Sequence, residues 1–67
     1  MLVKRSFTLA GHRTSVALEP EFWQVLGAIA AERRVSVAAL VAEVDANRPP
    51  QRPLASALRV HALLHAR

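Results

Sequence analysis

Six residues near the N-terminus alternate strictly between two kinds of side chain, and this alternation constrains the fold more than any other feature. Residues 13–18 read Arg-Thr-Ser-Val-Ala-Leu and are followed at once by Glu19 and Pro20. A period of two predicts a β-strand with one face toward a core. A lone strand leaves N–H and C=O groups unpaired along both edges and does not make a stable sheet. In so short a chain the simplest partner is the same strand of a second copy.

The length and composition limit what can stabilise such a chain. With 67 residues it is expected to form one domain, residues 1–67, with a small core. It has no cysteine, which excludes disulfides and thiolate metal sites and leaves oligomerisation as the common route to stability. No apolar run reaches the roughly 18 residues that span a bilayer, and residues 1–5 are not followed by the apolar segment of a signal peptide. We therefore expect a cytoplasmic protein with no membrane partner.

Charged side chains fall into three blocks. Residues 1–18 carry three basic and no acidic side chains, residues 19–46 carry two basic and five acidic ones, and residues 47–67 carry four basic ones. A basic strand beside an acidic body is typical of a surface that binds a polyanion. A two-stranded ribbon is able to enter the major groove, so double-stranded DNA is the expected partner.

The segment before the alternating strand also has strand character. Phe7 and Leu9 fall on one face of residues 4–10, and Ser6 and Thr8 fall on the other. Gly11 then permits a turn or a bulge. Residues 1–12 are therefore either an N-terminal arm or an extension of the strand at 13–18.

A helix is expected at residues 20–33, directly after the strand. Pro20 suits the first helical position, and apolar residues recur at helical spacing behind it. Its end offers no glycine or asparagine, so Arg34 is expected to adopt a left-handed conformation.

Two more helices are expected in the second half of the chain. Ser36 is a good N-cap for a helix at 36–46. Three prolines make residues 47–53 a loop. The helix expected at 54–65 is apolar most of the way round, which suits a helix packed between other elements or between subunits.

Side chains suited to catalysis or to metal binding are sparse. His61 and His65 are spaced i, i+4 on the last helix, but without a third ligand they are interpreted as packing residues. The chain shows no nucleophile with a base and an orienting group, no glycine-rich phosphate loop and no carboxylate pair at catalytic spacing. We expect no enzyme activity, no cofactor and no metal.

Short motifs recur in a fixed order along residues 4–64. They are Lys4-Arg5-Ser6, Ala10-Gly11-His12-Arg13-Thr14-Ser15, Leu18-Glu19 with Phe22-Trp23, Ala30-Ala31-Glu32-Arg33, Ser36, Ala39-Leu40-Val41-Ala42-Glu43 with Asp45, and Leu54-Ala55-Ser56-Ala57-Leu58-Arg59-Val60. In this order and spacing the chain resembles the ribbon-helix-helix (Arc/MetJ-type) transcription regulators, and among them a subgroup of small bacterial ribbon-helix-helix domain proteins.

The resemblance implies a mainly α fold and a homodimer or a higher homo-oligomer. One N-terminal strand of each copy pairs antiparallel with its counterpart, above two helices and an additional C-terminal helix. The outward strand residues that it places on DNA bases are Arg13, Ser15 and Ala17. The phosphate contacts expected with it are Lys4, Arg5, Arg34, Ser36 and Val37. The expected dimer core is Val16, Leu18, Phe22, Trp23, Leu26, Leu40, Val41, Val44 and Leu58.

Two functions follow from these features. The first is a dimeric, sequence-specific DNA-binding protein, a small transcriptional regulator with its ribbon in the major groove. The alternative is a ribbon-helix-helix scaffold that acts as a protein-interaction or antitoxin-like module through the helix at 54–65. The basic N-terminal segment favours the first function. Ala17, which offers bases only a methyl group, and the apolar breadth of the last helix favour the alternative.

Overall fold

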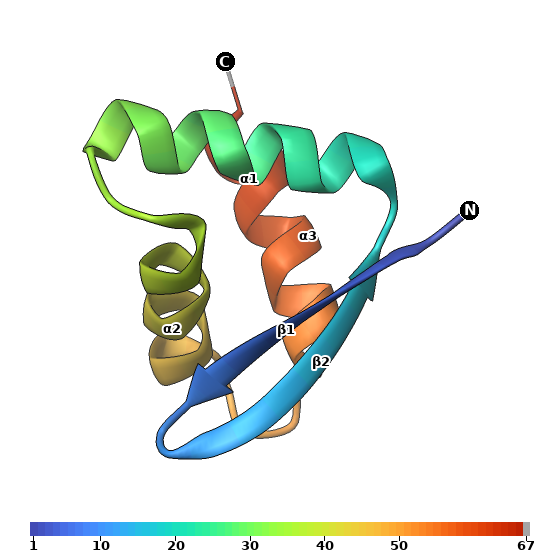
Figure 1. The fold of residues 1–67 in the computed structure, drawn as a ribbon, viewed down its shortest axis with the longest axis vertical. Helices are drawn as coiled ribbons and strands as arrows, with labels where there is room; N and C mark the ends of the chain where they lie inside the picture. The colour runs from blue at the N-terminus through green and yellow to red at the C-terminus, as the bar shows by residue number, and fades with distance from the viewer. Residues whose placement is uncertain (67) are drawn as a thin grey trace.

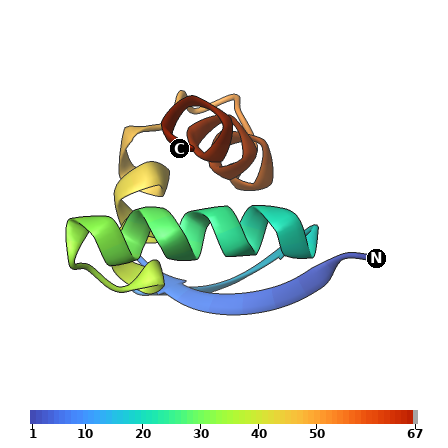
Figure 2. The same cartoon turned by 90° about the horizontal axis from the view of Figure 1, so that it is seen from above.

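The computed structural model describes residues 1–66 and contains two strands followed by three helices (Figure 1). Their bounds are β1 Val3–Leu9, β2 His12–Leu18, α1 Pro20–Arg33, α2 Val37–Asn47 and α3 Leu54–His65. α1 and α3 span the ranges that the sequence indicates, and α2 lies one residue further along than expected. Seen from above, the strands form one side of the molecule and the helices cover the other side (Figure 2).

The two strands form an antiparallel hairpin within one chain. Val3 pairs with Leu18 at the open end, and Leu9 pairs with His12 beside the turn. Residues 3–9 of the same chain pair with one edge of this strand, so it is not the unpaired strand that the sequence indicated. Its pairing across a homodimer stays a prediction. Residues 3–9 are accordingly a separate strand, neither an arm nor a continuation of β2, and His12 begins β2.

A two-residue turn explains why the chain folds back on itself. Ala10 and Gly11 have φ angles of 51° and 81°. Two positive φ values define the type I′ turn, whose twist matches that of a two-stranded ribbon. Glycine adopts this conformation readily, whereas alanine at Ala10 is strained by its Cβ.

Relieving this strain gives a first prediction. Ala10→Asn is expected to raise the free energy of unfolding by about 0.5–1 kcal/mol, because asparagine tolerates the left-handed region better than alanine. Gly11→Ala is expected to lower it by about 1 kcal/mol. That cost is torsional, since no atom lies within 4 Å of the added Cβ. Urea unfolding of the two variants measures both changes, and equal stabilities would contradict the turn assignment.

The core lies between the inner face of the hairpin and the three helices. Phe7, Leu9, Val16 and Leu18 are buried on the strand side. Leu26, Leu40, Val41 and Leu58 are fully enclosed on the helix side. α3 contacts β2, and α2 contacts β1, so both strands are held from the same side. Helix α3 is part of this core, because its residues Ala57, Leu58 and Ala62 are buried.

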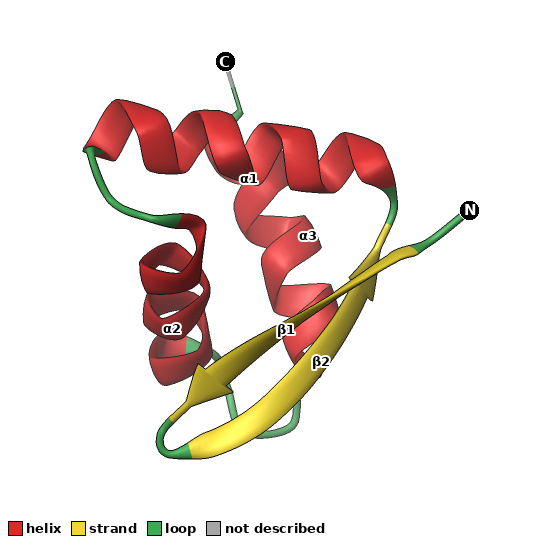
Figure 3. Cartoon of the chain, viewed as in Figure 1, coloured by secondary structure: helices red, strands yellow, loops and turns green. Residues whose placement is uncertain are grey.

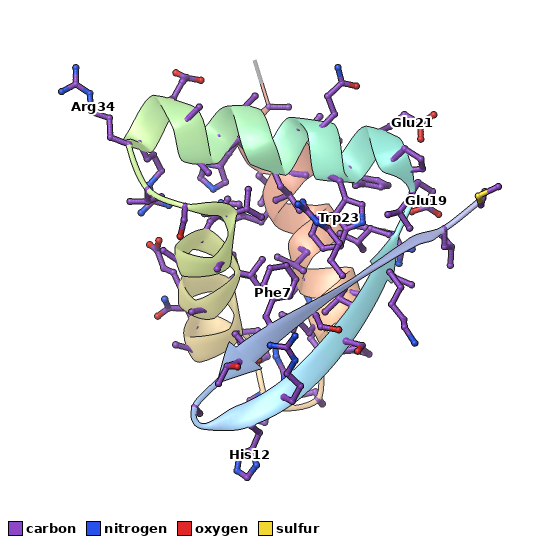
Figure 4. The ribbon with its side chains drawn as sticks, in the orientation of Figure 1. Phe7, His12, Glu19, Glu21, Trp23 and Arg34 are labelled. Carbon is purple, nitrogen blue, oxygen red and sulfur yellow. The ribbon has the colours of Figure 1, made fainter. Side chains whose placement is uncertain are left out.

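Trp23 fastens α1 to the first strand. Its indole Nε1 donates a hydrogen bond to the backbone oxygen of Val3 at 2.8 Å. Its ring packs against Phe7 with centroids 5.9 Å apart, and the guanidinium of Arg5 lies over it at 5.3 Å. Figure 4 shows Phe7 and Trp23 pointing into the space between the ribbon and the helices.

The turn between α1 and α2 ends one helix and caps the next. Arg34 has φ 57° and ψ 39°, which confirms the predicted left-handed conformation. The N–H groups of Arg34 and Val35 return to carbonyls of the last turn of α1, a Schellman arrangement. The Ser36 hydroxyl accepts a hydrogen bond from the Ala39 amide at 3.0 Å and caps α2 as predicted.

Ion pairs join the helices at the surface. Arg59 on α3 binds the Glu19 carboxylate at 3.0 Å, and Arg33 on α1 binds Glu43 on α2 at 2.6 Å. A hydrogen bond from the backbone of Glu19 itself lowers the pKa of the Glu19 carboxyl most, and the hydrogen bond from Arg59 lowers it further.

The hairpin turn and the α2–α3 loop lie at the same end of the molecule, opposite α1 (Figure 3). Among the helices described, none is long and apolar enough to cross a membrane.

Candidate nucleic-acid interface

The outward face of the hairpin carries six side chains that point away from the core. The register places them in three facing pairs, which are Lys4 with Ala17, Ser6 with Ser15, and Thr8 with Arg13. This face therefore contains all three of the side chains predicted to contact bases. Their neighbours on β1 supply a second row of polar groups beside them.

Cross-strand contacts organise these polar groups. The hydroxyl oxygens of Ser6 and Ser15 lie 3.0 Å apart and share a hydrogen bond. Arg13 Nη1 donates to the Thr8 hydroxyl at 3.5 Å. All four side chains are exposed, so their remaining donors and acceptors are open to a ligand. The ribbon thus presents hydroxyl groups in its middle and a guanidinium near its turn.

The charge of this face is positive. Lys4 and Arg13 lie on it, and no acidic residue occurs among residues 1–18. Arg5 belongs to the opposite face, where its guanidinium covers the Trp23 ring. The two predicted phosphate-binding residues of the N-terminal segment therefore leave the ribbon on different sides, with Lys4 outward and Arg5 at the helix side.

The other predicted phosphate contacts gather at the turn between α1 and α2. Figure 2 shows this turn and the start of α2 on the same side of the molecule as the ribbon. The Ser36 hydroxyl is used by the cap, and the amides of Val37 and Ala38 are the first N–H groups of α2. Such groups favour an anion at the helix N-terminus. Arg34 points outward from the end of α1 (Figure 4).

The residues predicted to form a dimer core are covered by their own chain. Eight of the nine are buried, and the ninth, Phe22, is half-buried beneath the Arg59 guanidinium. The eight are Val16, Leu18, Trp23, Leu26, Leu40, Val41, Val44 and Leu58. These residues form the core of the single chain, and their place in a dimer stays a prediction.

Ser6 and Thr8 were not among the predicted contact residues, although they lie on the outward face. The signal was present in the sequence, since Phe7 and Leu9 alternate with them and Gly11 follows. Recognising the hairpin would have placed both residues beside Ser15 and Arg13. The sequence showed the faces of this segment without showing which strand it pairs with.

The two histidines of α3 pack against each other. The rings of His61 and His65 lie 4.3 Å apart, and His61 Nε2 is buried without a hydrogen-bond partner. Within the described residues no group of three potential metal ligands occurs. Burial lowers the pKa of His61, and the neighbouring His65 lowers it further. Arg33 acts in the same direction, and Glu43 opposes them.

This lowered pKa predicts that acid weakens the fold. Near and below the ordinary histidine pKa of 6.5 the unfolded chain binds more protons at His61 than the folded chain. The free energy of unfolding therefore decreases as the pH is lowered. Urea unfolding at about pH 7.5 and about pH 5.5 is expected to show this loss. His61→Phe should reduce this loss. An undiminished loss in His61→Phe would contradict the assignment.

The chain belongs to the ribbon-helix-helix domain family. The family model described as "Ribbon-helix-helix domain" matches residues 2–66, which covers both strands and all three helices. This match confirms the resemblance drawn from the sequence motifs. No curated protein and no solved structure matched the chain.

Proposed function

We propose that the protein binds double-stranded DNA through the outward face of its ribbon and acts as a small transcriptional regulator. The observation that carries this proposal is the exposed, polar and acid-free face that Arg13, Ser15 and Lys4 share. A two-stranded ribbon fits the major groove, where side chains meet base edges. Domains of this family typically bind DNA as dimers. A DNA-binding role also favours a cytoplasmic location in a bacterial cell.

The predicted phosphate contacts lie on this face and beside it. Lys4 points outward and Arg5 lies at the helix side of the ribbon, and the turn between α1 and α2 lies on the same side of the molecule as the ribbon (Figure 2). In this arrangement the ribbon reads base edges, while the flanking groups bind the DNA backbone and fix the register.

The proposal includes a homodimer in which each copy brings its own complete ribbon. The ribbon-helix-helix family supports dimerisation, and the hairpin of one chain supports a separate ribbon for each copy. Two such ribbons related by a two-fold axis favour an operator with two half-sites about one helical turn apart. Light scattering at micromolar concentration tests the dimer, and a folded monomer would contradict this part of the proposal.

Salt dependence of DNA binding tests the proposal itself. If Lys4, Arg5 and Arg34 each neutralise one phosphate, affinity is expected to fall about 40-fold per chain between about 50 and 200 mM salt. Fluorescence anisotropy with labelled genomic fragments measures this change. An absence of binding at the lower salt concentration would overturn the proposed function.

A second candidate function is a protein-interaction surface on α3. Leu63 and Leu64 are 77% and 72% exposed, and Leu64 borders a pocket of about 230 Å³ between α2 and α3. Contiguous exposed leucines are typical of a surface that binds a partner. The double substitution Leu63→Ser/Leu64→Ser separates the two functions, because it leaves the buried side of α3 and the ribbon unchanged. Lost partner binding with retained DNA binding would support this second function.

A further inference from the structure

A pocket of about 230 Å³ lies between α2 and α3, beside the loop that joins them. The two helices pack against each other, and Figure 3 shows them side by side. The lining combines aliphatic side chains with two arginines, Arg48 at the end of α2 and Arg52 in the loop. The proposed DNA-binding function uses none of the residues that line this pocket.

We propose that this pocket binds a small organic monocarboxylate, with its charged end at Arg52 and Arg48 and its apolar body against the aliphatic side chains. An apolar cavity of about 150 Å³ is large enough to hold benzene. The pocket therefore has room for a body of that size together with a carboxylate group. The inference goes beyond the proposed function and does not depend on it.

The two arginines supply the donors for the carboxylate. Arg52 is exposed, and its guanidinium forms no hydrogen bond or ion pair within the described residues. Arg48 donates from Nε to the Asp45 carboxylate at 2.9 Å and from Nη1 to the Arg52 backbone oxygen at 2.6 Å. These two bonds hold the Arg48 guanidinium beside the loop and leave its Nη2 group for a ligand. Hydrogen bonds from guanidinium to carboxylate are among the strong ones in proteins.

The loop restricts the positions that both arginines can take. It contains Pro49, Pro50 and Pro53, whose rings fix the backbone φ angle. The amide of Arg52 donates to the Pro49 oxygen at 3.0 Å and closes a turn. Because the backbone is already ordered, binding loses less conformational freedom than it would in a flexible loop.

The charge of the lining favours an anion. The acidic side chain of the lining is that of Glu43, and its carboxylate binds Arg33 at 2.6 Å. Its charge is therefore offset by a residue outside the lining, whereas Arg52 has no such partner. The pocket thus keeps a net attraction for a single negative charge.

The apolar part of the lining suits the body of the ligand. Val44 and Ala57 are buried, Val60 is half-buried and Leu64 is 72% exposed. Covering apolar surface such as that of Leu64 is favourable in water. A ligand with both a carboxylate and an apolar body therefore gains from both parts of the pocket, whereas acetate or a neutral amide gains from one part only.

Titrations of the isotope-labelled full chain, followed by amide and methyl chemical shifts, test the inference with benzoate as the probe. Benzoate is expected to bind at about pH 7 with a Kd of about 1 mM and to shift signals of residues 47–53 and 57–65. Benzamide lacks the charge and acetate lacks the apolar body, so each is expected to bind about 10-fold more weakly. Equal affinity for benzoate and benzamide, or shifts spread evenly over the protein, would overturn the site.

Substitutions of exposed side chains test the two parts of the pocket separately. Arg52→Gln is expected to weaken benzoate binding about 5- to 10-fold. Arg13→Gln removes the same charge from the ribbon and should leave benzoate binding unchanged. Leu64→Ser is expected to weaken it about 3- to 10-fold, and Leu63→Ser, at an exposed leucine outside the lining, should not.

The controls also decide between a built site and general adsorption. Circular dichroism spectra verify that all four variants keep the fold. If Arg13→Gln weakened benzoate binding as much as Arg52→Gln, or Leu63→Ser as much as Leu64→Ser, the pocket would not be the site. An unchanged affinity in Arg52→Gln would equally overturn the inference.

Discussion

Trp23→Ala is expected to unfold most of the protein at room temperature. The indole is 7% exposed, packs on Phe7 and donates its Nε1 hydrogen to the Val3 carbonyl at 2.8 Å. Truncating a buried tryptophan to alanine costs about 3–5 kcal/mol. The core of a domain this small rarely supplies more than about 3–5 kcal/mol, so the loss is comparable to the whole stability. The same contact holds β1 to α1, and its removal also frees the first strand.

Trp23→Phe is the matched variant for this prediction. It keeps an aromatic ring against Phe7 and removes the hydrogen bond to Val3, so a loss of about 1–2 kcal/mol is expected. Urea unfolding followed by circular dichroism compares both variants with the wild-type protein. If Trp23→Ala lost less than about 1 kcal/mol, the role of this side chain in fastening the hairpin would be contradicted.

Arg13→Ala is expected to weaken binding to the preferred duplex by about 5- to 150-fold. This range corresponds to the 1–3 kcal/mol of a good bidentate contact to a base. Arg13→Lys keeps the charge without the planar pair of donors and is expected to recover little of the specificity. The fold should remain intact, because Arg13 is exposed and bonds only to the Thr8 hydroxyl.

Arg52→Ala is the control for Arg13→Ala. It removes the same charge from an exposed arginine in the α2–α3 loop, outside the ribbon. Anisotropy titrations of the two variants at one salt concentration separate a local contact from a general effect of net charge. Equal losses in both variants would contradict base contact by Arg13.

The helices could be predicted from the sequence because the residues that start and end a helix act locally. In the structure, Pro20 begins α1, Arg34 ends it in the left-handed conformation, and Ser36 caps α2. Apolar residues at helical spacing identified which side chains are buried. They could not identify whether the same chain or a second copy covers them, because burial depends on partners that a periodic pattern does not name.

The partner of the alternating strand was missed for a physical reason. A two-residue hairpin is best signalled by Asn-Gly or Asp-Gly, and this chain has Ala10 before Gly11. Alanine disfavours the positive φ that the turn requires, so tertiary packing of Phe7 and Leu9 outweighs a local preference. The sequence therefore placed the β2 residues on the outward face and omitted their β1 neighbours Ser6 and Thr8.

A disulfide introduced between the two strands tests most directly whether the ribbon forms within one chain. The hydroxyl oxygens of Ser6 and Ser15 lie 3.0 Å apart, and the chain has no cysteine of its own. The double variant Ser6→Cys/Ser15→Cys, oxidised at low concentration, is expected to give a cross-linked monomer on a non-reducing gel and by intact mass. The single variant Ser15→Cys is the control and should stay free of cross-links. Covalent dimers as the main product of either variant would show that the ribbon is shared between copies and would contradict the single-chain hairpin.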